Sequence, residues 1–424
     1  MLQIHTIREN QELVIKQLAV KQFDARSLID QALQIDTSRR HIQNEHDNLL
    51  SHQNQLAKQI GDLYKAGKKQ EADDLKNKSG ALKEESKALG HKLEELEKEL
   101  YQILVKLPNT PSVVVPAGKT PDDNEVVYSS PGELPVLADS ALPHWELTTK
   151  YDLIDFELGV KVTGAGFPVY KGKGARLQRA LISFFLDRAT ASGYTEFQPP
   201  ILINEESGFG TGQLPDKEGQ MYHVGIDNLY LIPTAEVPVT NILRDEIVPA
   251  DKLPVKMTAY TPCFRREAGS YGKDVRGLNR LHQFDKVEIV QIAHPDHSYA
   301  ILEEMREYVA SLLHELELPF RTLKLCGGDM SFASALTYDM EVWSAAQKRW
   351  LEVSSVSNFE SFQANRLKLR YREGSSKPAL AHTLNGSALA LPRIVAALLE
   401  NNQREDGIHL PRVLVPYTGF SIIN

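Results

Sequence analysis

Large apolar residues recur at seven-residue intervals through the first quarter of the chain. Two series share this spacing: Leu28, Ile35, Ile42, Leu49, Leu56 and Leu63, then Leu75, Leu82, Leu89, Leu96 and Ile103. The second series interleaves with Leu93, Leu100 and Leu107, which completes the a and d positions of a heptad. This pattern predicts two helices of a coiled coil.

A short interval, residues 61–69, separates the two series and contains Gly61 and Gly67. Such a short connection favours an antiparallel helical hairpin. At about 1.5 Å per residue, each helix would extend on the order of 50 Å. Arg39, His46 and Gln53 occupy seam positions of the first helix and should weaken its pairing.

Proline marks the end of the helical segment. None occurs before residue 108, whereas prolines are frequent from Pro108 to Pro143. Because proline removes a backbone donor and clashes inside helices, a domain boundary is predicted near residue 108. The expected domains are a helical arm, residues 1–108, and a second domain, residues 109–424. Residues 108–146 are interpreted as a linker that wraps a surface.

The second domain contains both helical and strand patterns. The Pro199-Pro200 pair breaks any central strand over residues 194–202 and indicates a sheet edge or an interface. Strands are expected over residues 257–265, 282–291 and 350–356. The first two would be joined by a loop that contains Gly269, Gly272 and Gly277. Helices are expected over residues 175–191 and 390–400.

Composition narrows the class of protein. With 42% hydrophobic and 25% charged residues, and no apolar run of roughly 18 residues, the chain is expected to be soluble. The first residues lack the basic and then apolar pattern of a secretory signal, so a cytoplasmic location is expected. Cys263 and Cys326 are the only cysteines, and their spacing supports neither a disulfide framework nor a zinc site.

The distribution of charge indicates which partners the arm could contact. The net charge of −8 means that any contact with nucleic acid must be local. The predicted tip of the arm carries Lys58, Lys65, Lys68, Lys69, Lys76 and Lys78, and acidic residues lie near its base. A basic tip suits a phosphate backbone. A charged coiled coil is also often only a solvated face, or a strut for protein docking, so the arm alone leaves these alternatives open.

The strand pair around residues 257–291 carries the candidate chemistry. No GxxxxGK[ST] loop occurs, so nucleotide phosphates would need other partners. The loop supplies arginines, whose forks match phosphate geometry: Arg265, Arg266, Arg276 and Arg280. Glu267 is predicted to share a strand face with Arg265, and Phe284 to share one with Glu288. Phe284 could stack on an adenine, although a solvated loop and a core phenylalanine fit the same pattern.

Three stretches form an ordered set: residues 174–177 with 198–200, residues 261–270 with 280–288, and residues 385–393. They resemble motifs 1, 2 and 3 of bacterial seryl-tRNA synthetases, a family of class II aminoacyl-tRNA synthetases. An N-terminal helical hairpin joined to the catalytic domain is also the family's arrangement, so the resemblance covers the whole chain. It implies the α+β class, with an antiparallel β-sheet flanked by helices, and a homodimer whose interface involves motif 1.

The resemblance assigns roles around ATP. Arg265 would hold the α-phosphate and the serine carboxylate, Arg280 would hold the bent γ-phosphate, and Arg393 would cover the adenine and reach the γ-phosphate. These three are the candidate catalytic residues. Arg266 replaces a residue that is small in many family members, which leaves its role open. The candidate ATP-binding set is Arg265, Arg266, Glu267, Leu281, Phe284, Glu352, Val353, Ser354, Ser355 and Arg393.

The resemblance also implies a metal and a serine site. Glu352 and Ser355 resemble the family's Mg²⁺ ligands, which are hard oxygen donors. The candidate serine-binding set is Thr234, Ala235, Glu236, Arg265, Glu288, Asn385 and Ser387. How Glu236 and Glu288 divide the amino and hydroxyl contacts stays open. Polar groups that pair with the substrate hydroxyl would reject alanine by roughly 10⁴-fold in favourable cases.

The implied activity is that of a serine–tRNA ligase. Serine would react with ATP to give seryl-adenylate and pyrophosphate, and then be transferred to the 3′ end of tRNA(Ser), with tRNA(Sec) as a further candidate acceptor. Two alternatives remain. A class II relative could load an amino acid onto a carrier protein, but such relatives usually lack the long arm. A non-catalytic coiled-coil scaffold would be expected to lose Arg265, Glu288 or Arg393, and all three are present.

Overall fold

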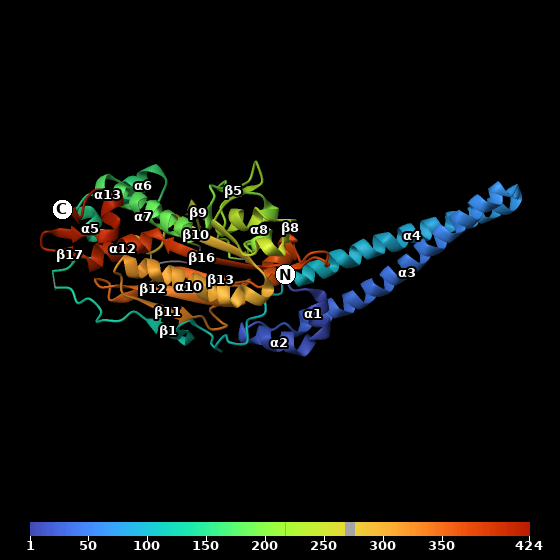
Figure 1. Ribbon diagram of the computed structural model, residues 1–424, viewed down its shortest axis with the longest axis horizontal. Helices are drawn as coiled ribbons and strands as arrows, with labels where there is room; N and C mark the ends of the chain where they lie inside the picture. Colours follow the sequence, from blue (N-terminus) through green and yellow to red (C-terminus); the bar gives the residue numbers. More distant parts are fainter. Residues whose placement is uncertain (139, 217, 268–275) are drawn as a thin grey trace. The chain divides into compact units, whose positions relative to one another are not determined.

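The computed structural model describes residues 1–138, 140–216, 218–267 and 276–424 (Figure 1). The chain divides into two compact units. The first comprises Met1–Ala19 and Phe23–Pro108, and the second comprises Val20–Gln22 and Asn109–Asn424. The loop glycines Gly269 and Gly272 lie outside the described residues.

The first unit is helical. It contains α1 (Ile4–Glu9), α2 (Gln11–Val20), α3 (Arg26–Lys65) and α4 (Lys69–Leu104). The helices α3 and α4 pack against each other along their length (Figure 1), which confirms the predicted long helical arm. The chain reverses within residues 66–68, where Gly67 has a φ of +77°. Glycine enters this left-handed region without a steric penalty, so the reversal can be short.

The polar residues of the arm's seam have partners. His46 Nε2 lies 3.1 Å from Ser86 Oγ, and Gln53 Nε2 donates to the Leu82 carbonyl oxygen over 2.6 Å. Both contacts run between α3 and α4. The third seam residue, Arg39, forms an ion pair within its own helix instead. The His46–Ser86 pair is therefore a matched polar layer in the seam, which favours a single register of the two helices.

An eight-stranded sheet is the frame of the second unit. In spatial order its strands are β1 (Glu125–Ser129), β11 (Phe320–Lys324), β12 (Leu336–Ser344), β13 (Arg349–Asn358), β16 (His382–Ala390), β10 (Gln283–Ala293), β9 (Val255–Phe264) and β4 (Thr195–Glu196). All neighbours are antiparallel except β4, which pairs with β9 in parallel. A helical arm with an antiparallel sheet and flanking helices confirms the predicted α+β class.

Helices pack against both faces of this sheet. One face packs in the main core against α7 (Gly172–Ala191), α10 (Ser298–Glu315) and α12 (Leu391–Asn401). The other face packs against α9 (Glu236–Asn241) and α11 (Ser361–Leu367).

Strand β10 supplies side chains to both layers, because successive residues of a strand point to opposite faces. Val287 and Ile289 enter the main core, whereas Val290 and Ile292 enter the cluster under α9 and α11. Phe284, Lys286 and Glu288 continue the second set toward the start of the strand. Lys286 and Glu288 therefore lie on the face of the sheet that carries α9 and α11.

Smaller elements complete the second unit. The helices are α5 (His144–Lys150), α6 (Phe156–Val162), α8 (Glu205–Thr211) and α13 (Val415–Thr418). The short strands are β2 (Ile154–Asp155), β3 (Val169–Tyr170), β5 (Leu202–Ile203), β6 (His223–Val224), β7 (Leu229–Leu231), β8 (Ile247–Pro249), β14 (Arg370–Arg372), β15 (Ala379–Leu380), β17 (Gln403–Arg404), β18 (Gly407–His409) and β19 (Ile422–Ile423). No helix in the described ranges is long and apolar enough to cross a membrane.

Most elements expected from the pattern are present. Residues 175–191 lie in α7, residues 257–265 and 282–291 correspond to β9 and β10, and β4 is an edge strand before the proline pair, as predicted. The interpretation of residues 108–146 as a linker is wrong in part. Residues 125–129 form β1, which pairs with β11 and closes one edge of the sheet. This five-residue strand is too short to stand out among the surrounding prolines.

Replacing Gly174 with alanine should destabilise the second unit. A Cβ at Gly174, in the first turn of α7, would lie 2.2 Å from the Leu153 carbonyl oxygen, and relieving such a clash costs about 1–3 kcal/mol. All three tryptophans belong to the second unit, so their fluorescence reports its thermal unfolding separately from the arm. The unfolding temperature should fall.

Gly80→Ala is the matched control, because a Cβ at Gly80 of α4 would meet nothing within 4 Å. It should leave the tryptophan transition unchanged and stabilise the arm by about 1 kcal/mol. An unchanged tryptophan transition in Gly174→Ala would contradict the close approach of α7 to Leu153.

Candidate active site

The candidate amino-acid site is built on β10. Glu288 lies opposite Ser387 of β16 on one side and Ala259 of β9 on the other. Directly opposite residues of neighbouring strands point to the same face, so Glu288 and Ser387 share a surface. Asn385, two residues before Ser387, lies on that face as well. The register of two strands thus brings together three predicted serine-binding residues.

A buried hydrogen-bond network surrounds Glu288. Thr234 Oγ1 donates to Glu288 Oε2 over 3.0 Å, and the Glu236 backbone N–H donates to the same Thr234 oxygen over 3.2 Å. Lys286 Nζ lies 2.6 Å from Glu288 Oε2. Gln363 of α11 donates to Glu236 Oε1 over 2.7 Å. Three segments of the chain therefore converge on two carboxylates: residues 234–236, β10 and α11.

This cluster has an unbalanced charge. Glu236, Lys286 and Glu288 are only 7%, 6% and 1% exposed, so water screens them weakly. Two carboxylates against one ammonium leave one negative charge when all three are ionised. Burial raises the pKa of Glu236 to about 7, and repulsion from Glu288 adds to the rise. A ligand that brings one positive charge would relieve this repulsion.

The candidate nucleotide site lies at the start of β10. The Arg265 guanidinium lies 5.3 Å from the centre of the Phe284 ring. Arg280 forms a 2.9 Å ion pair with Glu267. Arg393, in the first turn of α12, donates to the Glu352 carbonyl oxygen over 2.6 Å. The three predicted catalytic arginines thus all contact other predicted site residues.

One local prediction is wrong. Arg265 and Glu267 do not share the face of a strand, because β9 ends at Phe264. The Arg265 N–H still pairs with the His282 carbonyl oxygen over 3.0 Å. Beyond that bond the chain turns, and Glu267 adopts a φ of +47°. The Glu267 carboxylate is held by Arg280 from the other limb of the loop rather than by strand alternation.

A β-bulge places the candidate metal ligands. Residues three apart in a regular strand point to opposite faces. In the pairing of β12 with β13, Glu341 lies opposite Glu352 and Met340 lies opposite Ser354, so Val353 is an extra residue. The bulge returns Glu352 and Ser355 to the same face, since one extra residue reverses the alternation.

The surroundings of this pair suit a hard cation. Asp339 lies opposite Ser355, and its Oδ1 atom is buried without a hydrogen-bond partner. Burial and the Glu352 charge raise the pKa of Asp339 well above its ordinary value. Among the described residues no group of three or more His, Cys, Asp or Glu side chains could hold a metal by itself. Glu352, Ser355 and Asp339 offer oxygen donors of the kind that Mg²⁺ accepts, and this ion usually takes one or two carboxylates and completes its shell with water and substrate phosphates.

Other predicted residues lie less directly in the site. The Leu281 side chain is part of the main core, and Ala235 and Val353 are buried without side-chain polar groups. Ser354 Oγ donates to the Ser387 carbonyl oxygen over 2.6 Å and so joins β13 to β16. Arg266 is exposed, with its guanidinium 5.4 Å from the centre of the Tyr222 ring.

Sequence reasoning missed Lys286, Gln363 and Asp339. Lys286 had a signal, because it falls between Phe284 and Glu288 on the same face of a predicted strand. Gln363 and Asp339 had none, since they reach the site from α11 and β12, which the motifs do not include.

The antiparallel sheet, the arginine-bearing strand pair β9–β10 and the arginine in the first turn of α12 define a class II aminoacyl-tRNA synthetase. Residues 222–402 match the tRNA synthetase class II core domain (G, H, P, S and T). Residues 1–111 match the seryl-tRNA synthetase N-terminal domain.

Full-length relatives narrow the class to one family. The serine–tRNA ligase of Salinibacter ruber is 54% identical, over all of this chain and 99% of the relative. The serine–tRNA ligase of Chlorobium luteolum is 48% identical with the same coverage. The crystal structure of seryl-tRNA synthetase from Pyrococcus horikoshii complexed with ATP matches with a TM-score of 0.92 and 35% identity, over all of this chain and 99% of that one. The chain belongs to the seryl-tRNA synthetase family and is an ATP-dependent aminoacyl-tRNA synthetase.

Proposed function

We propose that this chain activates L-serine with ATP to form seryl-adenylate and pyrophosphate, and transfers the seryl group to the 3′-terminal ribose of tRNA(Ser). The observation that carries the choice of amino acid is the buried cluster of Thr234, Glu236, Lys286 and Glu288. Its unbalanced negative charge suits the ammonium of an amino acid. Its closely spaced polar groups suit a small side chain with a hydroxyl.

The proposed serine site uses both carboxylates. The substrate ammonium takes the place of the missing positive charge, and the hydroxyl hydrogen-bonds to the network around Glu288 and Ser387. Alanine would leave these buried groups without a partner, which is why a hydroxyl can be selected strongly. Asn385, whose side chain hydrogen-bonds Glu236, helps to orient that carboxylate. Arg265 would hold the serine carboxylate.

When ATP binds, the arginines would exchange their present protein partners for groups of the nucleotide. Arg265 lies over Phe284 in this structure; when ATP binds, its guanidinium would turn to the α-phosphate and free the ring to stack on adenine. Arg280 would leave Glu267 for the γ-phosphate, which frees Glu267 to contact the adenine. Arg393 would cover the other side of the adenine. For Arg265 and Arg280 the exchange replaces an aromatic face or a carboxylate with a phosphate, which an arginine fork matches well.

The chemistry follows from charge and position. A carboxylate oxygen of serine attacks the α-phosphorus, the bond to the bridging oxygen breaks, and pyrophosphate leaves with its charge held by Arg280 and Arg393. No side-chain nucleophile is needed. A bound Mg²⁺, held by Glu352 and Ser355, would neutralise phosphate charge. In the second step a ribose hydroxyl of the tRNA attacks the acyl carbonyl and AMP leaves. Holding the reacting groups in the correct position supplies most of the rate enhancement.

The arm would supply the RNA contact. Its tip carries Lys65 and Lys68 beside the reversal at Gly67, in a chain with a net charge of −8. A cluster of lysines at one end suits the backbone of the long variable arm of tRNA(Ser), and tRNA(Sec) is a second acceptor to test. We also propose a homodimer formed through α7 and β4, a cytoplasmic location, and the division of the chain into an arm of residues 1–108 and a catalytic domain of residues 109–424.

Arg265→Ala should abolish serine-dependent exchange of labelled pyrophosphate into ATP, with a loss of at least about 10²-fold, because the developing charge at the α-phosphate loses its arginine. The exposed Arg404→Ala should retain activity. Exchange is measured with each standard amino acid in turn. Exchange with another amino acid but not with serine would overturn the substrate assignment.

The KM for serine should rise as the pH falls below about 7. Glu236 has a pKa raised to about 7, so below that pH it binds a proton and loses its attraction for the ammonium. The expected limiting rise is about tenfold per pH unit. The KM for ATP, measured in the same exchange assays, should not follow this curve. A serine KM that stays flat between about pH 6 and 8 would contradict the role of Glu236.

Deleting residues 36–100 should separate the two steps. Adenylate formation depends on the second unit and should survive, whereas charging of tRNA should collapse. Both are measured on one preparation, with tryptophan fluorescence as the check on folding. Loss of both activities would mean that the arm is structural.

A further inference from the structure

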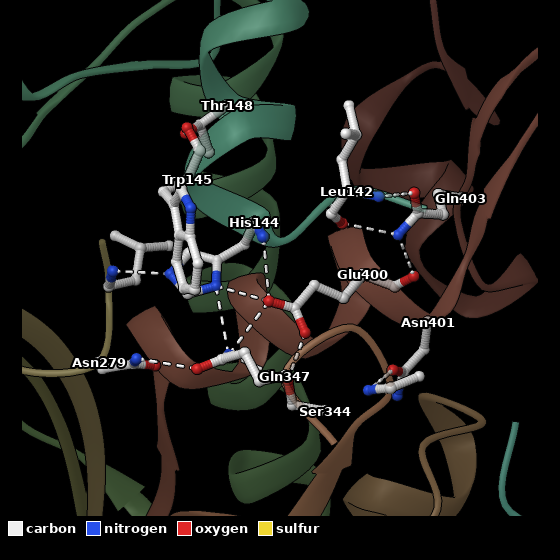
Figure 2. A network of polar contacts seen from close by, with 12 residues as sticks. Leu142, His144, Trp145, Thr148, Asn279, Ser344, Gln347, Glu400, Asn401 and Gln403 are labelled. Carbon is white, nitrogen blue, oxygen red and sulfur yellow. Dashed lines mark hydrogen bonds and ion pairs between the residues drawn. The ribbon is translucent and has the colours of Figure 1, made fainter. Parts of the chain in front are cut away.

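A buried histidine–carboxylate pair lies beside residues 277–279 of the loop that joins β9 to β10, here called the nucleotide loop (Figure 2). His144 begins α5 and Glu400 lies near the end of α12, and both residues are 0% exposed. His144 Nδ1 lies 2.7 Å from Glu400 Oε1, and the His144 backbone N–H donates to the same oxygen over 3.0 Å. Neither residue contacts the predicted substrate-binding side chains, so the proposed chemistry leaves this buried pair unexplained.

The hydrogen bonds fix the protonation of the ring. The Leu278 backbone N–H donates to His144 Nε2 over 2.9 Å. An amide N–H can only donate, so Nε2 must present its lone pair, and the ring proton must be on Nδ1, where it points at Glu400. A Cβ at Gly277 would lie 2.3 Å from Nε2, so the loop meets the ring edge at a residue without a side chain. The pair thus holds the backbone of the nucleotide loop.

A second path of hydrogen bonds leads from Glu400 to Asn279, the residue after Leu278. Gln347 Nε2 donates to Glu400 Oε1 over 3.1 Å and to Ser344 Oγ over 2.9 Å. The side-chain oxygen of Gln347, Oε1, then accepts from Asn279 Nδ2 over 2.9 Å. Figure 2 shows both branches meeting at the Glu400 carboxylate. Leu278 is therefore held through His144, and Asn279 is held through Gln347.

Burial raises the pKa of Glu400, but the hydrogen bonds from His144 and Ser344 lower it by more. The carboxyl is therefore ionised. A buried carboxylate is costly unless its lone pairs are satisfied, and here four donors satisfy them: His144 N–H, His144 Nδ1, Gln347 Nε2 and Ser344 Oγ. A carboxylate satisfied in this way holds the groups that donate to it in one arrangement.

The held segment connects directly to the arginines of the nucleotide site. Arg393 Nε donates to the Asn279 carbonyl oxygen over 3.1 Å, and Arg280 is the next residue. Arg393 and Glu400 lie seven residues apart on α12, two turns along one face. Helix α12 therefore holds the Leu278–Asn279 segment at two points, once directly and once through His144 and Gln347.

We propose that the His144–Glu400 pair is a positioning device for the ATP site: it fixes residues 278–279 so that Arg280 and Arg393 are aligned for the γ-phosphate. His144, Gln347 and Glu400 touch no reacting atom and are positioning residues. This inference rests on the proposed role of the two arginines. It predicts that breaking the network weakens ATP binding specifically. Serine binding in the pocket around Glu288 should stay unchanged.

The test compares three variants in the serine-dependent pyrophosphate exchange assay. His144→Phe keeps the ring volume but removes the acceptor for Leu278 N–H, and should raise the KM for ATP roughly 10- to 100-fold with an unchanged KM for serine. His144→Gln can return an acceptor to the Nε2 position and should recover most of the loss. Gln403→Leu is the matched control. It breaks hydrogen bonds to the Leu142 and Glu400 backbones in the same region, without a path to the loop.

The outcomes separate the hypotheses. A wild-type protein that does not exchange pyrophosphate with serine refutes the proposed function, whatever the variants do. If the wild type is active and His144→Phe shows only a lower unfolding temperature, like Gln403→Leu, the pair is purely structural and the proposal is overturned. Should His144→Phe fail to fold, Gln347→Leu tests the other branch: a selective rise in the KM for ATP supports the proposal, and an unchanged value overturns it.

Discussion

The second unit depends on a balance of buried charges that water screens only weakly. Glu236 and Glu288 lie in one buried pocket, and Lys286 compensates only one of them. Such a pocket is stable only if every remaining lone pair is satisfied, which explains why Thr234, Gln363 and Asn385 come from three different elements to hydrogen-bond the two carboxylates. The alternation of β10 makes this possible, since it keeps Lys286 and Glu288 on one face and commits Val287 and Ile289 to the core on the other.

The nucleotide half of the site has an excess of positive charge. It gathers arginines, which would repel one another, and the protein holds them with its own groups: Glu267 for Arg280, the Phe284 ring for Arg265, and the Glu352 backbone for Arg393. The two halves are complementary, one short of a positive charge and the other suited to bind a polyanion. An amino acid and ATP would each supply what its half lacks, and their reacting groups would meet near Arg265, the residue common to both predicted sets.

Local patterns in the sequence predicted much of this architecture. The heptads predicted α3 and α4, and strand alternation predicted β9 and β10, because these signals depend only on neighbouring residues. The resemblance supplied the candidate site residues, and the structure brings Thr234, Glu236, Glu288 and Asn385 together. Features that depend on pairing across the sheet were not predictable: the bulge at Val353, the turn that takes Glu267 off the strand, and the contact of His144 with Glu400, 256 residues away.

The polar layers of the arm have an evolutionary consequence. The His46–Ser86 and Gln53–Leu82 contacts each join α3 to α4 at one height. Sliding one helix past the other by a heptad, about 10 Å, would separate His46 from Ser86, its polar partner across the seam. An insertion in one helix alone would impose that slip on everything between it and the reversal at Gly67. The arm can therefore lengthen or shorten only by matched changes in both helices, which makes its length a slowly changing property, while the solvent-facing residues along it are free to diverge.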